Sequence, residues 1–407
     1  MPQAVIVAAA RTPIGRAVKG SLAGVRPDDL AAGVIAAALG QVPALDPATL
    51  DDLYLGCAEP RDEHGGNMAR RVAVQLGLDG VPAATVNRFC ASSVQTARMA
   101  FHAIRAGEGD AFVSAGVECV SRYRNFGSAG VDAPGTHHPA FAAAEERTAA
   151  TALSNDRWRD PRGDAQLPDV YIAMGQTAEN VATLTGITRR EQDEFGVRSQ
   201  NRAELAIAGG VFDAEVAPVT LPDGRVVATD DGPRAGTTLE GISGLRPVFR
   251  PEGTVTAGNC CPLNDGAAAV VIMSDRRAAE LGVTPLARIV ATGVSGLSPE
   301  IMGLGPVEAS RQALTRARMG VADLDLVEIN EAFAVQVIAS ARELGLDEDR
   351  LNVHGGAIAL GHPFGSTGAR IMTTLLNAMR LRDASVGLET MCVGGGQGMA
   401  IILERLG

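Results

Sequence analysis

The fold class is decided by residues 85–104, which read Thr-Val-Asn-Arg-Phe-Cys-Ala-Ser-Ser-Val-Gln-Thr-Ala-Arg-Met-Ala-Phe-His-Ala-Ile. Residues 85–86 are typical of a strand, residues 91–93 of a turn with small side chains, and residues 94–104 of a helix. The same succession surrounds this stretch, with predicted strands at Ala4–Ala9 and Leu53–Gly56 and predicted helices at Asp28–Leu39 and Asn67–Leu76. Strands that alternate with helices predict an α/β fold, in which helices cover both faces of a sheet.

A different texture begins near Ser121 and ends near Arg250. Clusters of Gly, Pro, Arg and Asp interrupt short helical stretches there, such as Thr188–Ala208. We interpret residues 121–250 as an insertion. The alternation then resumes at Ala267–Met273, Ala287–Thr292, Val307–Ala317, Leu326–Ile329 and Glu389–Leu403.

A weak internal repeat links the two ends of the chain. Thr85–Ile104 and Ala357–Leu376 both place a turn of small residues before a long helix, and they carry Cys90 and His362 respectively. This pattern predicts two similar α/β halves, although any two α/β segments share part of it.

Composition excludes several classes of protein. At about 150 residues per domain, 407 residues predict two or three domains. The net charge of −11 disfavours binding to nucleic acid or to anionic lipid. The longest apolar stretch, Leu30–Leu39, is about half of the roughly 20 residues that span a bilayer, so we predict no membrane span. Residues 1–7 lack the features of a signal peptide, and we expect a cytoplasmic protein.

Cys90 is the first candidate catalytic residue. The six cysteines are too sparse for a disulfide framework and show no zinc-binding spacing, so each is treated as a free thiol and no metal site is predicted. At the start of a helix, the helix dipole is expected to lower the pKa of the Cys90 thiol and make it a nucleophile. The alternative is a small buried core residue, which is the interpretation for Cys57 and Cys119.

Three further residues lie at turns or at the ends of strands. His362, in Leu360-Gly361-His362-Pro363, can deprotonate a thiol, or it can be a structural histidine bonded to backbone. Cys392 precedes a glycine turn whose N–H groups, that of Gly394 among them, can bind an oxyanion; a phosphate loop is disfavoured because its lysine is missing. The amide of Asn330 can fix a water or cap a helix.

Together these strings resemble the thiolase family along essentially the whole chain. The resemblance rests on Asn87–Ser93, on Asn330-Glu331-Ala332-Phe333, on Gly361-His362-Pro363 and on Cys392–Gly398, in that order. It implies a layered αβαβα fold of two similar halves with an inserted loop domain. The implied domains are residues 1–120 plus 251–275, the CoA-binding insertion 121–250, and residues 276–407.

The resemblance also implies a reaction. Cys90 attacks the 3-keto carbon of a 3-ketoacyl-CoA, while His362 activates the thiol and holds the thioester oxygen with a water fixed by Asn330. Cys392 then protonates the acetyl-CoA enolate, and the N–H groups of Cys90 and Gly394 stabilise the acyl oxygen. Free CoA finally takes the acyl group from Cys90. CoA is thus a co-substrate, and no tightly bound cofactor is implied.

The substrate is inferred from matches and departures. Arg234 matches the family position that packs on the adenine of CoA, with a solvated arginine as the alternative. Met174 is the second residue that the resemblance implies for CoA binding, and it lies in the string Ala173-Met174-Gly175, where many acetoacetyl-CoA thiolases have His-Met-Gly. Asn259-Cys260-Cys261-Pro262 stands in place of Asn-Ala-Ser-Gly. These departures favour a degradative enzyme for medium, long or bulky chains. The alternative is a biosynthetic thiolase that condenses two acetyl-CoA. A homodimer or homotetramer is expected.

Overall fold

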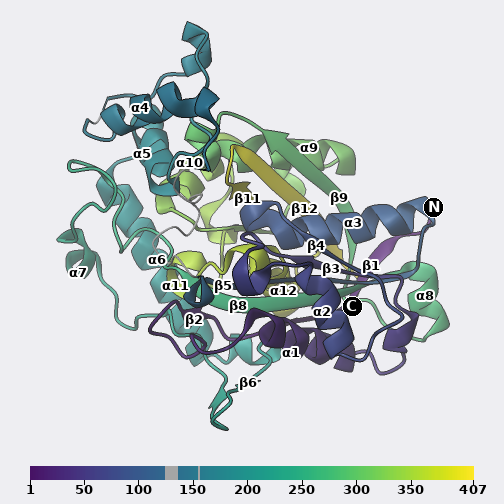
Figure 1. Cartoon of the computed structure of the whole chain (residues 1–407). Helices are drawn as coiled ribbons and strands as arrows, with labels where there is room; N and C mark the ends of the chain where they lie inside the picture. The colour runs from purple at the N-terminus through teal and green to yellow at the C-terminus, as the bar shows by residue number, and fades with distance from the viewer. Residues whose placement is uncertain (124–135, 155) are drawn as a thin grey trace.

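One long sheet organises the computed structural model, which describes residues 1–123, 136–154 and 156–407 (Figure 1). Its ten strands include β2, which pairs with β8, and nine strands in the order β10-β11-β12-β9-β1-β8-β5-β3-β4. The two parts of the sheet meet where β1 and β9 pair over only Val5↔Arg288 and Ile6↔Ala287. This short junction divides the strands into a first and a second half.

The first half is built from the N-terminal segments and one later strand. Its strands are β1 (Ala4–Arg11), β2 (Gly15–Arg16), β3 (Asp52–Gly56), β4 (Ala83–Val86), β5 (Ala111–Cys119) and β8 (Asn264–Ser274). Its helices are α1 (Pro27–Gly40), α2 (Met68–Gln75) and α3 (Ser92–Ala106), and α8 (Asp275–Glu280) follows β8. The strands and helices predicted in this half therefore agree with the structure to within a few residues.

The second half repeats this arrangement. Its strands are β9 (Ala287–Gly296), β10 (Leu326–Ile329), β11 (Val386–Val393) and β12 (Gln397–Arg405). Its helices are α9 (Gly305–Ala317), α10 (Ala334–Leu344), α11 (Ala357–Leu360) and α12 (Thr367–Leu381). The predicted segment Glu389–Leu403 comprises most of β11 and β12 with a glycine turn between them.

The layers follow from which helices contact which strands. Helix α1 packs on β8, β5 and β1, and α9 packs on β9, β12 and β11. Helices α3 and α12 contact each other and strands of both halves, so they form the middle layer. Helices cover both faces of the sheet at strand β8. Val271 and Met273 pack in the cluster with α1 on one face, whereas Val270 and Ile272 pack in the cluster with α3 and α12 on the other. The order of layers is αβαβα.

Helices form most of the regular structure that is described in the insertion. It holds α4 (Ala142–Thr151), α5 (Met174–Thr185), α6 (Arg189–Ala208) and α7 (Leu239–Ser243), with β6 (Val219–Thr220) paired to β7 (Val226–Val227). Helix α6 begins at the capping box formed by Thr188 and Glu191. Helices α5 and α6 pack against α10 of the second half. The predicted domain limits stay a prediction.

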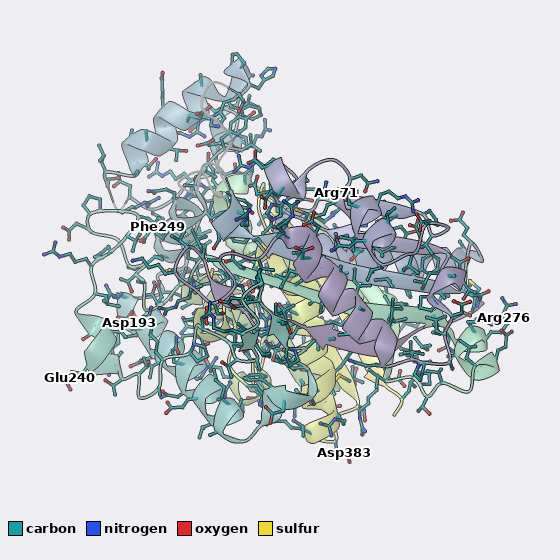
Figure 2. The ribbon with its side chains drawn as sticks, turned by 60° about the horizontal axis from the view of Figure 1, so that its bottom comes forward. Arg71, Asp193, Glu240, Phe249, Arg276 and Asp383 are labelled. Atoms are coloured by element: carbon teal, nitrogen blue, oxygen red, sulfur yellow. The ribbon has the colours of Figure 1, made fainter. Side chains whose placement is uncertain are left out.

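Charged side chains such as Glu240, Arg276 and Asp383 lie at the edge of the molecule in Figure 2. Among the helices that the structure describes, none is long and apolar enough to cross a membrane.

Candidate active site

Cys90 lies in the tight turn between β4 and α3. The turn is held by local bonds: the Asn87 side chain accepts from the Phe89 N–H at 2.8 Å, and the Ser92 hydroxyl accepts from the Arg88 N–H at 2.9 Å. Phe89 adopts a left-handed backbone with φ of 44°, a conformation that is costly for a residue with a Cβ. The half-buried Cys90 thus lies in the short 3-10 helix Phe89–Ala91, immediately before the middle-layer helix α3.

The predicted low pKa of Cys90 is wrong. Burial raises the pKa of its thiol to about 12, although a bond from the Gly394 N–H lowers it in part. Desolvation of a thiolate outweighs the helix dipole here, because the dipole acts with only a fraction of a charge. Cys90 is therefore a protonated thiol in the free protein, and its thiolate forms only when a base takes the proton.

The glycine turn after β11 faces Cys90. The N–H of Gly394 bonds to the Cys90 thiol, and a Cβ at Gly394 would lie 3.4 Å from the Phe89 ring. Gly396 has φ of 82°, and a Cβ there would lie 2.3 Å from the Leu297 carbonyl oxygen, so only glycine fits. Cys392, buried at the end of β11, has a thiol pKa that burial raises and that a Cys90 thiolate raises further. The two thiols are close enough to interact electrostatically.

His362 is held in one orientation and one protonation state. Its Nδ1 lies 2.7 Å from the Thr367 hydroxyl, which itself donates to the Pro363 carbonyl at 2.9 Å. The hydroxyl proton is thereby used, so Nδ1 carries the proton that it donates to Thr367 and Nε2 keeps its lone pair. Burial lowers the pKa of His362 to about 3, so the ring is neutral at neutral pH. The Asn264 side chain accepts from the His362 backbone N–H at 3.0 Å and fixes the turn.

Asn330 lies beside His362. It follows β10, and its Nδ2 is 3.3 Å from His362 Nε2. Its backbone is fixed by bonds from its N–H to the Thr390 carbonyl and from the Gln336 side chain to its own carbonyl. Among the described residues, none bonds to the buried Asn330 Oδ1. The structure thus brings Asn330 and His362 together, as it brings together Cys90, Cys392 and Gly394.

Glu118 was missed by the sequence analysis. This buried carboxylate on β5 accepts from the N–H groups of Ala58 and Gly365 and from the Tyr123 hydroxyl, at 2.7–2.9 Å. Burial raises its pKa to about 7, and these donors lower it in part. Since Gly365 lies three residues after His362, Glu118 holds the histidine turn. The signal was a single acid within a strand of otherwise apolar and small residues.

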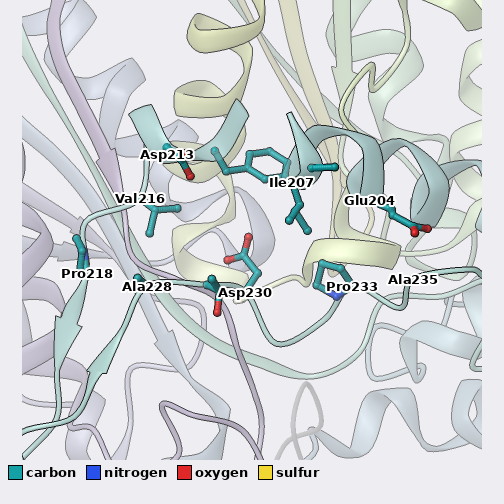
Figure 3. Close-up of a pocket in the computed structure, with 12 residues that line it drawn as sticks. Glu204, Ile207, Asp213, Val216, Pro218, Ala228, Asp230, Pro233 and Ala235 are labelled. Atoms are coloured by element: carbon teal, nitrogen blue, oxygen red, sulfur yellow. The ribbon is translucent and has the colours of Figure 1, made fainter. Parts of the chain in front are cut away.

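Two of the predicted residues line different cavities. Met174, the first residue of α5, lines a cavity of about 390 Å³ together with Cys90 and Gly394. Arg234 lines a separate cavity of about 140 Å³ with Arg16, Cys260 and Cys261. The neighbours of Arg234, Pro233 and Ala235, line a further cavity of about 540 Å³ beside α6 (Figure 3), and the residues described around it include none of the predicted catalytic groups.

Matches to two family models identify the family of this chain. The model described as thiolase, N-terminal domain, matches residues 4–276. The model described as thiolase, C-terminal domain, matches residues 283–405. The chain belongs to the thiolase family. The resemblance found in the sequence is thereby confirmed, and this thiolase is an acyltransferase that uses CoA as a substrate.

Full-length relatives of this thiolase carry different names. An acetyl-CoA acetyltransferase of Cupriavidus necator is 44% identical over 412 residues, covering 100% of both chains. A beta-ketoadipyl-CoA thiolase of Acinetobacter baylyi is 44% identical over 416 residues, again covering 100% of both. The crystal structure of human mitochondrial 3-ketoacyl-CoA thiolase superimposes with a TM-score of 0.83 at 36% identity, covering 99% of each chain. The likeness confirms the predicted fold and leaves three substrate classes among similar proteins.

Proposed function

We propose that this thiolase cleaves 3-ketoacyl-CoA with free CoA to give acetyl-CoA and a shortened acyl-CoA, through an acyl group carried on Cys90. The observation that carries the proposal is that Cys90 and Gly394 line one cavity large enough for an acyl chain, while the Cys392 thiol lies close enough to Cys90 to interact with it electrostatically. The Cys90 thiol supplies a nucleophile, the Cys392 thiol a proton, and the glycine turn an oxyanion donor.

In the first step the Cys90 proton passes to His362 as the sulfur attacks, because pKa values of about 12 for Cys90 and about 3 for His362 strongly disfavour a free thiolate and imidazolium. Because Nδ1 already donates to Thr367, the incoming proton goes to Nε2. The Cys90 sulfur attacks the 3-keto carbon, and the negative charge on the acyl oxygen is met by the N–H groups of Cys90 and Gly394. His362 Nε2–H and a water bonded to Asn330 hold the thioester oxygen as the bond between C2 and C3 breaks.

The second thiol completes the first half-reaction. Electrons of the broken bond form the enolate of acetyl-CoA, and Cys392 gives its proton to C2. A Cys392 with a raised pKa is a weak acid, but it is well matched to a carbon base that is stronger still. Free CoA then loses its proton to Cys392, and its sulfur takes the acyl group from Cys90. The released Cys90 thiolate takes its proton back from His362 Nε2, so every proton is returned by the end of the cycle.

The cavity favours acyl chains longer than acetyl. Its volume of about 390 Å³ is in the usual range of pockets for small ligands, about 300–1,000 Å³, whereas an acetyl group on Cys90 has only two carbons. Val170, Ile172 and Met174 line it with apolar atoms. These features support a medium or branched chain.

The test is loss of 3-ketoacyl-CoA absorbance on addition of CoA to the purified enzyme. We expect kcat/KM to be higher for a medium-chain or bulky substrate than for acetoacetyl-CoA. Val170→Trp, which fills the cavity, should lower kcat/KM for the longer substrate about tenfold or more and leave acetoacetyl-CoA nearly unchanged. Leu205→Trp, at an exposed position on α6, is the matched control. Activity confined to acetoacetyl-CoA would instead support condensation of two acetyl-CoA.

A further inference from the structure

A fourth cavity, of about 440 Å³, lies between α4, α5 and residues 156–159. Among the described residues, it shares no lining residue with the cavity beside Cys90 or with the one beside Arg234. Its lining carries four guanidinium groups, from Arg147, Arg157, Arg159 and Arg250, against the carboxylates of Asp156 and Glu300. In a chain whose net charge is −11, this cavity is locally cationic.

The surface arginines keep donors for a ligand. Arg157 makes one long bond, 3.4 Å, to the Leu184 carbonyl. Arg159 has no bond or ion pair with any residue in the described part of the chain. The charge of Arg147, in contrast, is neutralised by an ion pair in which its Nη2 lies 2.6 Å from Glu300 Oε1. Two exposed guanidinium groups therefore face the cavity with most of their N–H donors unused.

The buried arginine is the stronger evidence. Arg250 is only 4% exposed, and its Nε and Nη2 bond to the side chains of Gln176 and Asn180. Within the described residues, its buried Nη1 has no partner. A buried charged donor without an acceptor is costly, since it loses water and gains nothing in return. Arg250 also lines the cavity, so an anion bound there would lie beside its guanidinium group and compensate its buried charge.

The remaining lining residues narrow the class of ligand. Trp158 donates from its Nε1 to Glu300 at 2.8 Å, which, together with the Arg147 ion pair, occupies both oxygens of that carboxylate. Thr148 and Thr151 add hydroxyl groups. Guanidinium forks match the paired oxygens of phosphate and carboxylate groups, and the excess of two positive charges matches a dianion.

We propose that this cavity binds a compact dianion of the phosphate or dicarboxylate type, at a site separate from the thiolase centre. Arg250 is the buried anchor, and Arg157 and Arg159 close over the ligand from the surface. Helix α5 connects the two sites, because Asn180 lines the arginine cavity and Met174 lines the cavity beside Cys90.

Calorimetric titration of the purified full-length protein tests the site. Inorganic phosphate and succinate are titrated separately, at an ionic strength held constant with sodium chloride, and acetate serves as the monoanion. We expect saturable binding of at least one dianion and much weaker binding of acetate. The Arg157→Ala/Arg159→Ala protein should bind that dianion about tenfold or more weakly, because it lacks two charged donors that would bond to the ligand.

The control removes the same charge elsewhere. Arg190→Ala/Arg225→Ala deletes two exposed arginines that pair with Glu194 and Asp223, and it should leave the dissociation constant unchanged. Arg250→Lys keeps the charge, loses the fork and should weaken binding. Equal weakening in the control, or no saturable binding of either dianion at millimolar concentration, would overturn the proposal. So would a change of oligomeric mass in the double variant without anion binding, since the arginines would then serve a contact between copies.

Discussion

The two halves of this thiolase place equivalent strands in the same order but use them for different tasks. Outward from the middle of the sheet, the first half runs β1, β8, β5, β3 and the second runs β9, β12, β11, β10. In both, the outer pair is parallel and the next pair antiparallel. The middle-layer helices α3 and α12 follow the turns that carry Cys90 and His362.

Residues at equivalent strand ends of the two halves differ in the groups that they contact. Cys119 ends β5, and Cys392 lies near the end of β11. Cys57 follows β3 and bonds to the carboxylate of Glu118, whereas Asn330 follows β10 and contacts His362. In the first half these positions hold buried core residues, and in the second half they hold residues beside the candidate catalytic groups. Position in the fold alone therefore does not assign chemistry, because the neighbours of each side chain decide it.

Removal of Cys90, the proposed nucleophile of the first half, should have the largest effect. We expect Cys90→Ala to lower kcat for thiolysis by about 10⁴-fold or more, since the variant lacks the thiol that is proposed to carry the acyl group. Intact-mass measurement should detect an acylated wild-type enzyme and no acylated variant. Near-normal turnover of the folded variant would end the assignment of the nucleophile.

The two thiols at equivalent strand ends provide the sharpest comparison. Cys392→Ala should lower kcat by about 10²–10⁴-fold, the usual value for loss of a general acid or base. Cys119→Ala should leave kcat within about twofold and lower the melting temperature, because it leaves a small cavity in a buried cluster. Equal losses of kcat in both variants would show that the halves are not functionally distinct.

Glu118→Gln tests a smaller effect, the support that the first half gives to the histidine turn of the second. Gln offers one acceptor oxygen where the carboxylate now meets Ala58, Gly365 and Tyr123, so we expect kcat to fall about tenfold. The pKa of Glu118 is about 7, and its ionised form is the better acceptor. Wild-type kcat should therefore rise as pH increases through 7, and this inflection should be absent in the variant.

The pH profile of kcat distinguishes a positioning role of Glu118 from a general effect of the substitution on stability. The pKa of His362 is about 3 and that of Cys90 about 12, so neither group titrates near neutral pH. A variant that merely destabilised the protein would keep the inflection. An inflection near pH 7 that persists in Glu118→Gln would assign it to another group.

Local patterns in the sequence determined most of the secondary structure. Leu326–Ile329 is β10 residue for residue, and the predicted helix Thr188–Ala208 is α6 with its cap. These features follow from apolar spacing, capping residues and turn chemistry, all of which act within a few residues. The motifs around Cys90, His362 and Cys392 also determined the family, and thereby the kind of chemistry.

The tertiary structure alone decided the protonation states of the site residues and the hydrogen-bond partners of the buried charged side chains. The sequence places Cys90 at a helix start and predicts a low pKa for its thiol. The packing of β11, α12 and the glycine turn buries the thiol instead, and burial raises its pKa. Glu118 is separated from Gly365 by 247 residues, and Arg250 meets Asn180 across 70. Burial and hydrogen bonding at such separations depend on the whole fold, because desolvation is set by every atom that excludes water.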